Sequence, residues 1–396
     1  MSITTCPICR SKKFRSILNI KKFPYFTAPI NKETIKKKKI KNKAFNLQVV
    51  NCRNCTHTFL SKLPNLNILN ELYDKYYNYP SALNGFFTPE RDENFIKCFL
   101  KTQKITKNKK ILEVGCYDGY ILKRLKKYGY RVNGCDPSKG ALIGKKHGIK
   151  IRKEFFNPQK TNYGFFDYVI SRHLIEHIVD PLNWIKNLSS VLNKNGKLVI
   201  ETPNVEFFLK RGLPSVFSLQ HLHYFSKNSI RNLFKQANIN IEKIEENKEN
   251  FIIFAKKTKN STNKDKIFKN KFNNYLKFNE KYKKTKKIIS KIFENTNMKV
   301  AIWGAGGFGS VIDLFYEVPT NKILYFIDSD IKKKKMKFLS KSADIIHSSS
   351  IKNINANIII IASMYGNQIV DQIKKEKINL KVLNLFPNIK ILNIKN

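Results

Sequence analysis

The chain has 396 residues, of which 42% are hydrophobic and 12% aromatic. It is too long for one small core and too apolar for a disordered chain, so we predict two or three packed domains. No run of about 18 apolar residues is present, and the first residues, MSITTCPICR, lack the apolar core of a signal peptide. We therefore expect a cytoplasmic protein without a membrane-spanning helix.

The formal net charge is +46, but only ten of the 75 basic residues are arginine. Surfaces that bind nucleic acids favour arginine, because its planar guanidinium binds phosphate and guanine bidentately. Lysine is instead spread over the whole chain with asparagine and isoleucine, and all three have A/T-rich codons. Coding bias explains this composition most simply. The alternative is a positive field that attracts anionic substrates such as nucleotide diphosphates or acidic glycans.

Two C-x2-C pairs lie near the N-terminus, Cys6 with Cys9 and Cys52 with Cys55. In a reducing compartment, paired cysteines are better interpreted as metal ligands than as disulfides. Four thiolates complete a closed tetrahedral zinc site, which leaves no position for water and stabilises a fold rather than catalysing a reaction. The 42-residue gap between the pairs is longer than in most compact zinc ribbons. We predict a zinc-binding module over 1–62.

Residues 63–105 show helical apolar spacing and predict a helical connector, and from Lys110 strands and helices alternate. Strands are predicted within 109–115, 130–136, 149–155, 165–173, 196–204 and 250–257. Helices are predicted within 119–129, 139–148, 180–193 and 224–240, the last with Ser226 as its N-cap. This alternation predicts a parallel, doubly wound sheet in a domain of residues 106–257.

Small and acidic residues follow the first two strands of this domain. Gly115 and Gly119 allow close backbone approach to a ligand, in a segment that begins with Glu113. Asp136, 17 residues after Gly119, is placed to accept the ribose hydroxyls of an adenosyl cofactor. Its alternative role is a helix N-cap.

Three further side chains are weaker candidates for contact with the same cofactor. Asp118 is placed to pair with an ammonium group of the cofactor, or to favour a helix N-terminus through the dipole. Phe155 or Phe156 is placed to flank the adenine, or belongs to the core.

Residues 258–297 are rich in lysine and asparagine and predict solvated linker helices, followed by a smaller α/β domain over 298–396. This domain carries a G-x-G-x-x-G pattern after a strand, Gly304, Gly306 and Gly309, with Asp328 nineteen residues further on. By spacing alone this is a dinucleotide-binding fingerprint.

The segment FFDYVISRHLIEHIVDP resembles the fourth-strand region of class I S-adenosylmethionine-dependent methyltransferases, and KNGKLVIETPN resembles their next strand. The shared run is His173, Glu176, His177 and Asp180. The resemblance implies that His173 lies on a cofactor-side loop. A metal site at His173, Glu176 and His177 is the alternative.

Over its whole length the chain resembles the zinc-containing sugar C-methyltransferase family, which acts on nucleotide-linked deoxy-keto sugars. The resemblance implies a central Rossmann-like class I sheet, an N-terminal zinc module and a second C-terminal Rossmann-like domain that encloses substrate. Independent NAD binding by that C-terminal domain is the alternative. YDKYYNYPSA is similar to the family's tyrosine-rich segment, so Tyr77 or Tyr79 is expected to contact substrate. SLQHLHYFS is similar to its H-E-H-x-x-Y-F-S segment, which places His221 on the proposed general base.

Methylation of carbon next to a carbonyl requires a base that forms an enolate, which then attacks the methyl group. Histidine suits this role, since its ordinary pKa of about 6.5 leaves it largely neutral near pH 7. The chain departs from the family at Gln220 and Ser218, where the family has Glu and Tyr. Gln220 carries no negative charge to raise the basicity of a neighbouring histidine. His223 is either a second polar contact or a structural histidine.

The expected function is therefore methyl transfer from S-adenosylmethionine to a small-molecule sugar, nucleotide-linked or a surface-glycan precursor. A sugar O-methyltransferase is the first alternative. An RNA methyltransferase is a weaker alternative, because the chain lacks arginine clusters. A non-enzymatic scaffold with a decayed site is also weaker, because the pattern of Glu113, Gly115, Gly119 and Asp136 is intact.

Overall fold

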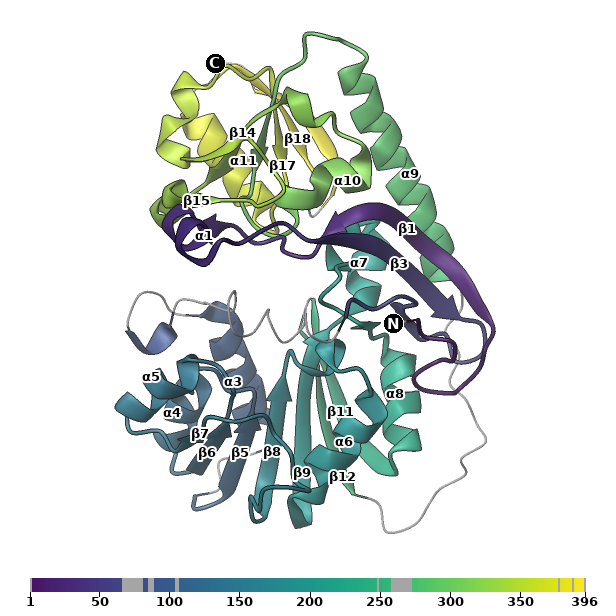
Figure 1. Cartoon of the computed structure of the whole chain (residues 1–396), viewed down its shortest axis with the longest axis vertical. Helices are drawn as coiled ribbons and strands as arrows, with labels where there is room; N and C mark the ends of the chain where they lie inside the picture. The colour runs from purple at the N-terminus through teal and green to yellow at the C-terminus, as the bar shows by residue number, and fades with distance from the viewer. Residues whose placement is uncertain are drawn as a thin grey trace. The chain divides into compact units, whose positions relative to one another are not determined.

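The computed structural model describes residues 2–65, 81–84, 89–103, 107–247, 249–257, 273–376, 378–386 and 388–394. The chain divides into two compact units, each built from several segments (Figure 1). Unit 1 comprises Met1–Ser16, Val49–Phe207 and Gln220–Lys271. Unit 2 comprises Ile17–Gln48, Phe208–Leu219 and Phe272–Asn396.

Unit 1 contains a seven-stranded sheet in the order β11-β12-β9-β8-β5-β6-β7. Its strands are β5 (Lys110–Val114), β6 (Arg131–Cys135), β7 (Ile151–Arg152), β8 (Phe166–Arg172), β9 (Leu192–Pro203), β11 (Ile239–Asn247) and β12 (Asn250–Lys257). β5 to β9 pair in parallel, whereas β12 is antiparallel to both β9 and β11. The alternation predicted a parallel sheet, which β5 to β9 confirm, whereas the antiparallel β12 and β11 make the sheet mixed. The α/β class that the resemblance to class I methyltransferases implies is thereby confirmed.

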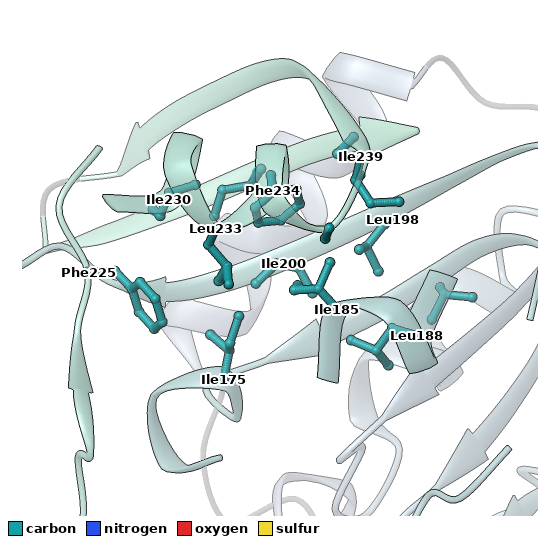
Figure 2. Packing of buried hydrophobic residues seen from close by; sticks show 14 of the residues in the cluster. Ile175, Ile185, Leu188, Leu198, Ile200, Phe225, Ile230, Leu233, Phe234 and Ile239 are labelled. Carbon is teal, nitrogen blue, oxygen red and sulfur yellow. The ribbon is translucent and has the colours of Figure 1, made fainter. Parts of the chain in front are cut away.

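Helices cover both faces of this sheet, because apolar side chains alternate along its strands. The helices are α3 (Glu90–Gln103), α4 (Tyr120–Lys126), α5 (Gly140–Lys146), α6 (Pro181–Ser190) and α8 (Lys227–Gln236), while α7 (Val205–Arg211) begins in unit 1 and ends in unit 2. On one face, Leu198 and Ile200 of β9 pack with Ile185 of α6 and Leu233 of α8 (Figure 2). Val199, between them in sequence, joins the core of the opposite face with α3 and α4.

The start of α8 follows the predicted cap. The Ser226 side chain accepts from Ser229 N, and the Ser229 hydroxyl accepts from Ser226 N at 2.8 Å, which forms a capping box. The prediction of Ser226 as N-cap is confirmed. The fixed helix start matters for function, because the segment that contains His221 leads directly into it.

A second sheet has the order β1-β3-β4-β10, and the cysteine pairs lie just before its first strand and at the turn between β3 and β4. Its strands are β1 (Phe14–Pro24), β3 (Ala44–Cys52), β4 (Thr58–Leu60) and β10 (His223–Tyr224). β4 and β10 are antiparallel, with His223 opposite Phe59, and Leu60 N donates to Leu222 O at 3.0 Å. The N-terminal module is thereby hydrogen-bonded to the segment around His221.

Unit 2 contains a six-stranded sheet in the order β16-β14-β13-β17-β18-β19, in which only β19 is antiparallel. Its strands are β13 (Val300–Trp303), β14 (Ile323–Asp328), β16 (Asp344–His347), β17 (Ile358–Ile361), β18 (Leu380–Asn384) and β19 (Lys390–Ile394). A small sheet pairs β2 (Ile30–Asn31) with β15 (Met336–Lys337). The helices of the unit are α1 (Lys32–Lys38), α9 (Asn273–Phe293), α10 (Ile312–Tyr316) and α11 (Gly366–Lys375).

The structure adds several strands that the sequence pattern did not predict, among them β1, β11, β16 and β19. All four lie at or next to the edge of a sheet, and β11 carries charged residues on its exposed side. Edge strands bury few side chains, so their apolar periodicity is weak. None of the helices described is long and apolar enough to cross a membrane.

Candidate active site

A glycine-containing loop joins β5 to α4 at the carboxyl edge of the unit 1 sheet. Gly115 and Gly119 have φ angles of +78° and +75°, in the left-handed region that favours glycine. A Cβ on Gly115 would lie 2.3 Å from Leu174 Cδ1. Leu174 therefore packs directly on the Gly115 backbone, in a loop at the edge of the sheet where open α/β folds bind ligands.

Asp136 follows β6 at the same edge and organises this loop. Its Oδ2 accepts from Tyr117 N at 2.8 Å, and its Oδ1 accepts from Ser138 N at 2.8 Å. The N-cap of α5 is Lys139, so Asp136 does not cap that helix. Its buried carboxylate instead joins the loops after β5 and β6.

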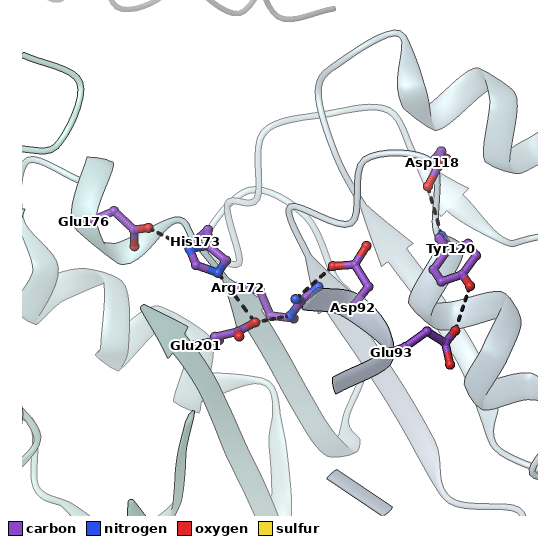
Figure 3. Close-up of polar contacts among 8 residues, drawn as sticks. All are labelled: Asp92, Glu93, Asp118, Tyr120, Arg172, His173, Glu176 and Glu201. Carbon is purple, nitrogen blue, oxygen red and sulfur yellow. Dashed lines mark hydrogen bonds and ion pairs between the residues drawn. The ribbon is translucent and has the colours of Figure 1, made fainter. Parts of the chain in front are cut away.

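Asp118 is also buried and connects the loop to residues 81–83. Its Oδ2 accepts from Ser81 Oγ at 2.7 Å and from Leu83 N at 3.2 Å, and its Oδ1 accepts from Tyr120 N at 3.0 Å (Figure 3). Ser81 belongs to the tyrosine-rich segment, whereas Tyr77 and Tyr79 lie outside the described residues.

Glu113, on β5, is 3% exposed and, unlike Asp118 and Asp136, has a carboxylate oxygen, Oε2, without a hydrogen-bond partner among the described residues. Burial raises its pKa to about 8, although the Arg172 guanidinium acts in the opposite direction. A nearby cation would therefore favour ionisation of this carboxyl group.

Arg172, at the end of β8, is the centre of a buried charge network (Figure 3). Its Nε lies 2.6 Å from Glu201 Oε2 and its Nη2 lies 3.0 Å from Asp92 Oδ1. Its guanidinium carbon lies 4.4 Å from the ring centroid of Phe95. Burial alone would raise the pKa of Glu201, but Arg172 and His173 outweigh it and lower that pKa to about 2.

We expect the Glu201 carboxylate to make acid stability depend on pH. Its pKa is lower in the folded chain than in the unfolded one, so the stabilisation is complete above about pH 4.5 and is lost as the pH falls towards 2. At pH 7, Glu201→Gln should lower the free energy of unfolding by about 3 kcal/mol. The difference from wild type should shrink below pH 4.5.

Denaturant titration in a Trp303→Phe background measures this effect, because Trp184 is then the single tryptophan and reports on unit 1. Glu246→Gln is the control, since Glu246 forms an exposed ion pair with Lys227 and should have an effect close to zero. A Glu201→Gln deficit that stays constant from pH 7 to pH 3 would contradict the assignment.

His173 and Glu176 extend the network towards a histidine pair. His173 has a φ of +48° and its Nδ1 lies 3.3 Å from Glu176 Oε1. Burial would lower the pKa of His173, but the carboxylates of Glu176 and Glu201 raise it. Glu176 is 1% exposed, and His173, His177 and His221 together lower its pKa to about 2 against the effect of burial.

His177 and His221 come from separate segments that hydrogen bonds hold together. Leu222 N donates to Glu176 O at 2.7 Å, and His177 Nδ1 lies 2.7 Å from Gln220 O. The ring centroids of His177 and His221 are 5.0 Å apart, with the rings nearly perpendicular. Of the predicted acceptor-side residues, His221 and Gln220 are thus beside the loop that follows β8.

His223 is placed differently from His221. It is 1% exposed, and its Nε2 lies 2.9 Å from Ile178 O while its Nδ1 lies 3.1 Å from His57 Nε2. Burial lowers the pKa of His223 to about 4. Both ring nitrogens are engaged within the protein, which favours a structural role for this histidine.

The four cysteines of the two pairs form a cluster, in which all four sulfur atoms lie within 4.8 Å of one another. Cys6 Sγ lies 3.5 Å from Cys55 Sγ, and Cys9 Sγ lies 3.6 Å from Cys52 Sγ. Tetrahedral zinc with bonds of about 2.3 Å places sulfur atoms about 3.8 Å apart. Asn54 N lies 3.4 Å from Cys52 Sγ, in the position of a second-sphere donor.

Residues 90–244 match the family model described as a methyltransferase domain. Over these residues the chain is similar to methyltransferases. The match covers the glycine loop, Asp136, the Arg172 network and the histidine pair, so every feature of the carboxyl edge described above lies within it, except for residues 81–83.

Curated relatives and solved structures resemble the methyltransferase domain. The chain is 32% identical over 120 residues to the ubiquinone biosynthesis O-methyltransferase of Pelagibacter ubique, covering 28% of this chain and 50% of that protein. It is 29% identical over 116 residues to the enzyme of that name from Coxiella burnetii, with the same coverage. The chain thus spans about half the length of the curated relatives it matches. A magnesium protoporphyrin IX methyltransferase from Synechocystis, solved with bound SAH, matches 49% of this chain and its own full length at 11% identity and a TM-score of 0.38.

Phe155 and Phe156 diverge in their surroundings within the methyltransferase domain. Phe155 is 64% exposed, whereas Phe156 packs on Tyr163 and Trp184 with ring centroids 4.8 and 5.8 Å apart. Phe156 therefore belongs to the core, and Phe155 alone is accessible to a ligand.

The glycine pattern of unit 2 has a close packing role. A Cβ on Gly309 would lie 2.0 Å from Gly304 O. Asp328 accepts from Ala305 N at 3.0 Å and pairs with Lys333 Nζ at 2.8 Å. The acidic residue of the fingerprint is thus engaged by the protein's own cation and backbone.

Sequence reasoning did not identify Arg172, Glu201, Asp92 or His57 as parts of this region. Arg172 directly precedes the recognised His173, and Glu201 lies in the recognised KNGKLVIETPN segment. Arg172 and Glu201 each lie in a strand predicted to be buried. Because buried charged residues are almost always paired, their presence in these strands could have predicted an ion pair.

Proposed function

We propose that the chain is an S-adenosylmethionine-dependent methyltransferase with a sugar as acceptor. The observation that carries the proposal is the left-handed glycine loop of Gly115 and Gly119, flanked by the buried carboxylates of Asp118 and Asp136, within a methyltransferase domain. Backbone at such a loop can approach a nucleoside closely, and a carboxylate after the second strand can accept ribose hydroxyls. Asp118 is proposed to face the ammonium group of the cofactor.

The other cofactor residues follow from position. Glu113 is proposed to become ionised beside the cationic cofactor, and His173 to border it from the loop after β8. Phe155, which is exposed, is proposed to flank the adenine. When bound, the cofactor supplies an electrophilic methyl group, and this chain supplies the groups that orient it and exclude water.

The acceptor side is proposed to contain His221 and Gln220, with Tyr77 or Tyr79 contributing from the tyrosine-rich segment. For a carbon acceptor next to a carbonyl, His221 would remove the carbon-bound proton. An oxygen acceptor is the second candidate, supported by the O-methyltransferase names of the relatives. The sugar acceptor itself rests on the whole-chain family resemblance.

We also propose that Cys6, Cys9, Cys52 and Cys55 hold a structural zinc ion. The four sulfur atoms supply the complete ligand set at spacings close to those of tetrahedral zinc, and Cys6, Cys52 and Cys55 are fully buried. With no open position, the ion would stabilise the fold and take no part in methyl transfer.

Calorimetry with S-adenosylhomocysteine tests the donor site. We expect wild type to bind and Asp136→Asn to bind at least about tenfold more weakly, because the charged acceptor of the ribose hydroxyls is lost. Asp167→Asn is the matched control at the opposite end of the sheet, where Asp167 accepts from Lys110 N at 2.8 Å. Absence of binding by wild type would overturn the proposal. A panel of nucleotide sugars with labelled methyl donor then identifies the acceptor, and NMR of the product distinguishes carbon from oxygen.

A further inference from the structure

Glu176, His177 and His221 form a cluster of metal-ligating side chains separate from the cysteines. One ligand atom from each lies within 4.8 Å of the others. Glu176 and His177 belong to the short turn η3 (Ile175–His177) after β8, and His221 lies two residues before the start of β10. Two hydrogen bonds described above, from Leu222 N to Glu176 O and between His177 Nδ1 and Gln220 O, fix the two segments to each other.

The hydrogen bonds also determine which atoms are available. A carbonyl oxygen only accepts, so His177 Nδ1 carries the proton and donates to Gln220 O, which leaves the Nε2 lone pair available. This second-sphere bond is the arrangement that usually orients a metal-binding histidine. Glu176 is held by Thr202 Oγ1, which donates to Oε2 at 3.1 Å, while Oε1 lies 3.3 Å from His173 Nδ1.

We infer that Glu176, His177 and His221 bind a divalent transition-metal ion of the zinc or cobalt type. Two imidazoles and one carboxylate suit such ions, whereas magnesium and calcium favour oxygen ligands throughout. Bonds of about 2.1 Å to a tetrahedral ion require ligand atoms about 3.4 Å apart, so small side-chain adjustments suffice. Three protein ligands leave at least one open position for a further oxygen atom.

The surrounding charges favour a cation. The network contains three carboxylates, on Asp92, Glu176 and Glu201, against one guanidinium, on Arg172, and the imidazole of His173. Glu176 is 1% exposed, so its carboxylate is shielded from water. A divalent ion adds positive charge at the end of the network where the carboxylate is not paired with arginine.

The ion has a consequence for the acceptor, and this consequence alone rests on the proposed function. A coordinated His221 has no lone pair with which to accept a proton, so it is not the base of the metal-bound protein. A substrate hydroxyl at the open position instead loses its proton to solvent more readily. The oxygen then bonds to the methyl carbon as the carbon–sulfur bond breaks, and S-adenosylhomocysteine leaves with the electron pair. Metal binding thus favours the oxygen acceptor.

Metal stoichiometry tests the site without cofactor or sugar. Full-length protein without a polyhistidine tag, loaded with one zinc ion per chain, is titrated with Co²⁺ alone. The titration is followed by calorimetry and by absorption spectroscopy. We expect one further ion per wild-type chain, without the intense charge-transfer absorption of cobalt–thiolate bonds. Glu176→Gln and His177→Gln should each weaken this step by at least about tenfold. His147→Gln, at the exposed end of α5, should leave it unchanged.

Crystals of wild type soaked with CoCl₂ provide a second measurement if a variant does not fold, with an anomalous peak expected among the three side chains. The inference is overturned if wild type binds no ion beyond the first, or if both variants bind it as tightly as wild type. Binding of S-adenosylhomocysteine to the same samples separates the two proposals. Intact cofactor binding without a second ion removes only the metal site, and a second ion without cofactor binding removes only the proposed function.

Discussion

We expect His221→Ala to lower kcat by about 10²–10⁴-fold while the affinity for S-adenosylhomocysteine stays within about twofold of wild type. His221 is proposed to act on the acceptor, either as the base or as a ligand of the ion, and both roles are lost in alanine. The cofactor loop of Gly115, Asp118 and Asp136 is untouched by this change. Steady-state kinetics and calorimetry on the same preparation measure the two quantities.

His147→Ala is the control for this substitution, because His147 is an exposed histidine of the methyltransferase domain, away from the carboxyl edge of the sheet. Turnover by His221→Ala above one tenth of the wild-type value would show that another group does this work. Metal content then distinguishes the two roles. If His221 is a base, wild type and His221→Ala should each contain one ion per chain. If His221 is a metal ligand, wild type should contain two ions per chain and His221→Ala one.

The second large effect concerns the cysteine cluster. Cys52→Ser is expected to remove the structural zinc and to lower the melting temperature of unit 1 by at least about 10 °C, because structural zinc contributes about 10–16 kcal/mol in small zinc-binding peptides. The cluster packs in one core with Phe59, Phe225 and Leu233, so its loss reaches the main sheet. Zinc analysis and Trp184 fluorescence measure the outcome.

Cys52→Ser should also reduce turnover, since β4 pairs with β10 and Leu60 N donates to Leu222 O next to His221. Hydrogen exchange of residues 58–60 and 222–224 should accelerate together. Cys98→Ser is the control, because Cys98 is a half-buried thiol on α3 outside the cluster and should leave the zinc content unchanged. Unchanged melting and zinc content in Cys52→Ser would exclude a structural metal held by this residue.

The histidine and carboxylate positions explain why the acceptor is harder to predict than the donor. The donor loop is contiguous, from Glu113 to Gly119, with Asp136 at a fixed spacing set by one helix and one strand. The acceptor side combines Glu176 and His177 with His221, from segments about 45 residues apart. Such a combination depends on how two loops meet, which apolar periodicity does not encode.

The sequence alone determined the central strands and helices of residues 106–257, the α/β class of residues 298–396, the Ser226 cap and the two cysteine pairs. Each depends on residues close together in the chain, on periodicity or on fixed spacing. The tertiary structure alone decided the pairing of Arg172 with Glu201 and Asp92, the contact of His57 with His223, and the cluster of Glu176, His177 and His221. These contacts join distant segments at the carboxyl edge of one sheet, and burial away from water gives them their charge and hydrogen-bond partners.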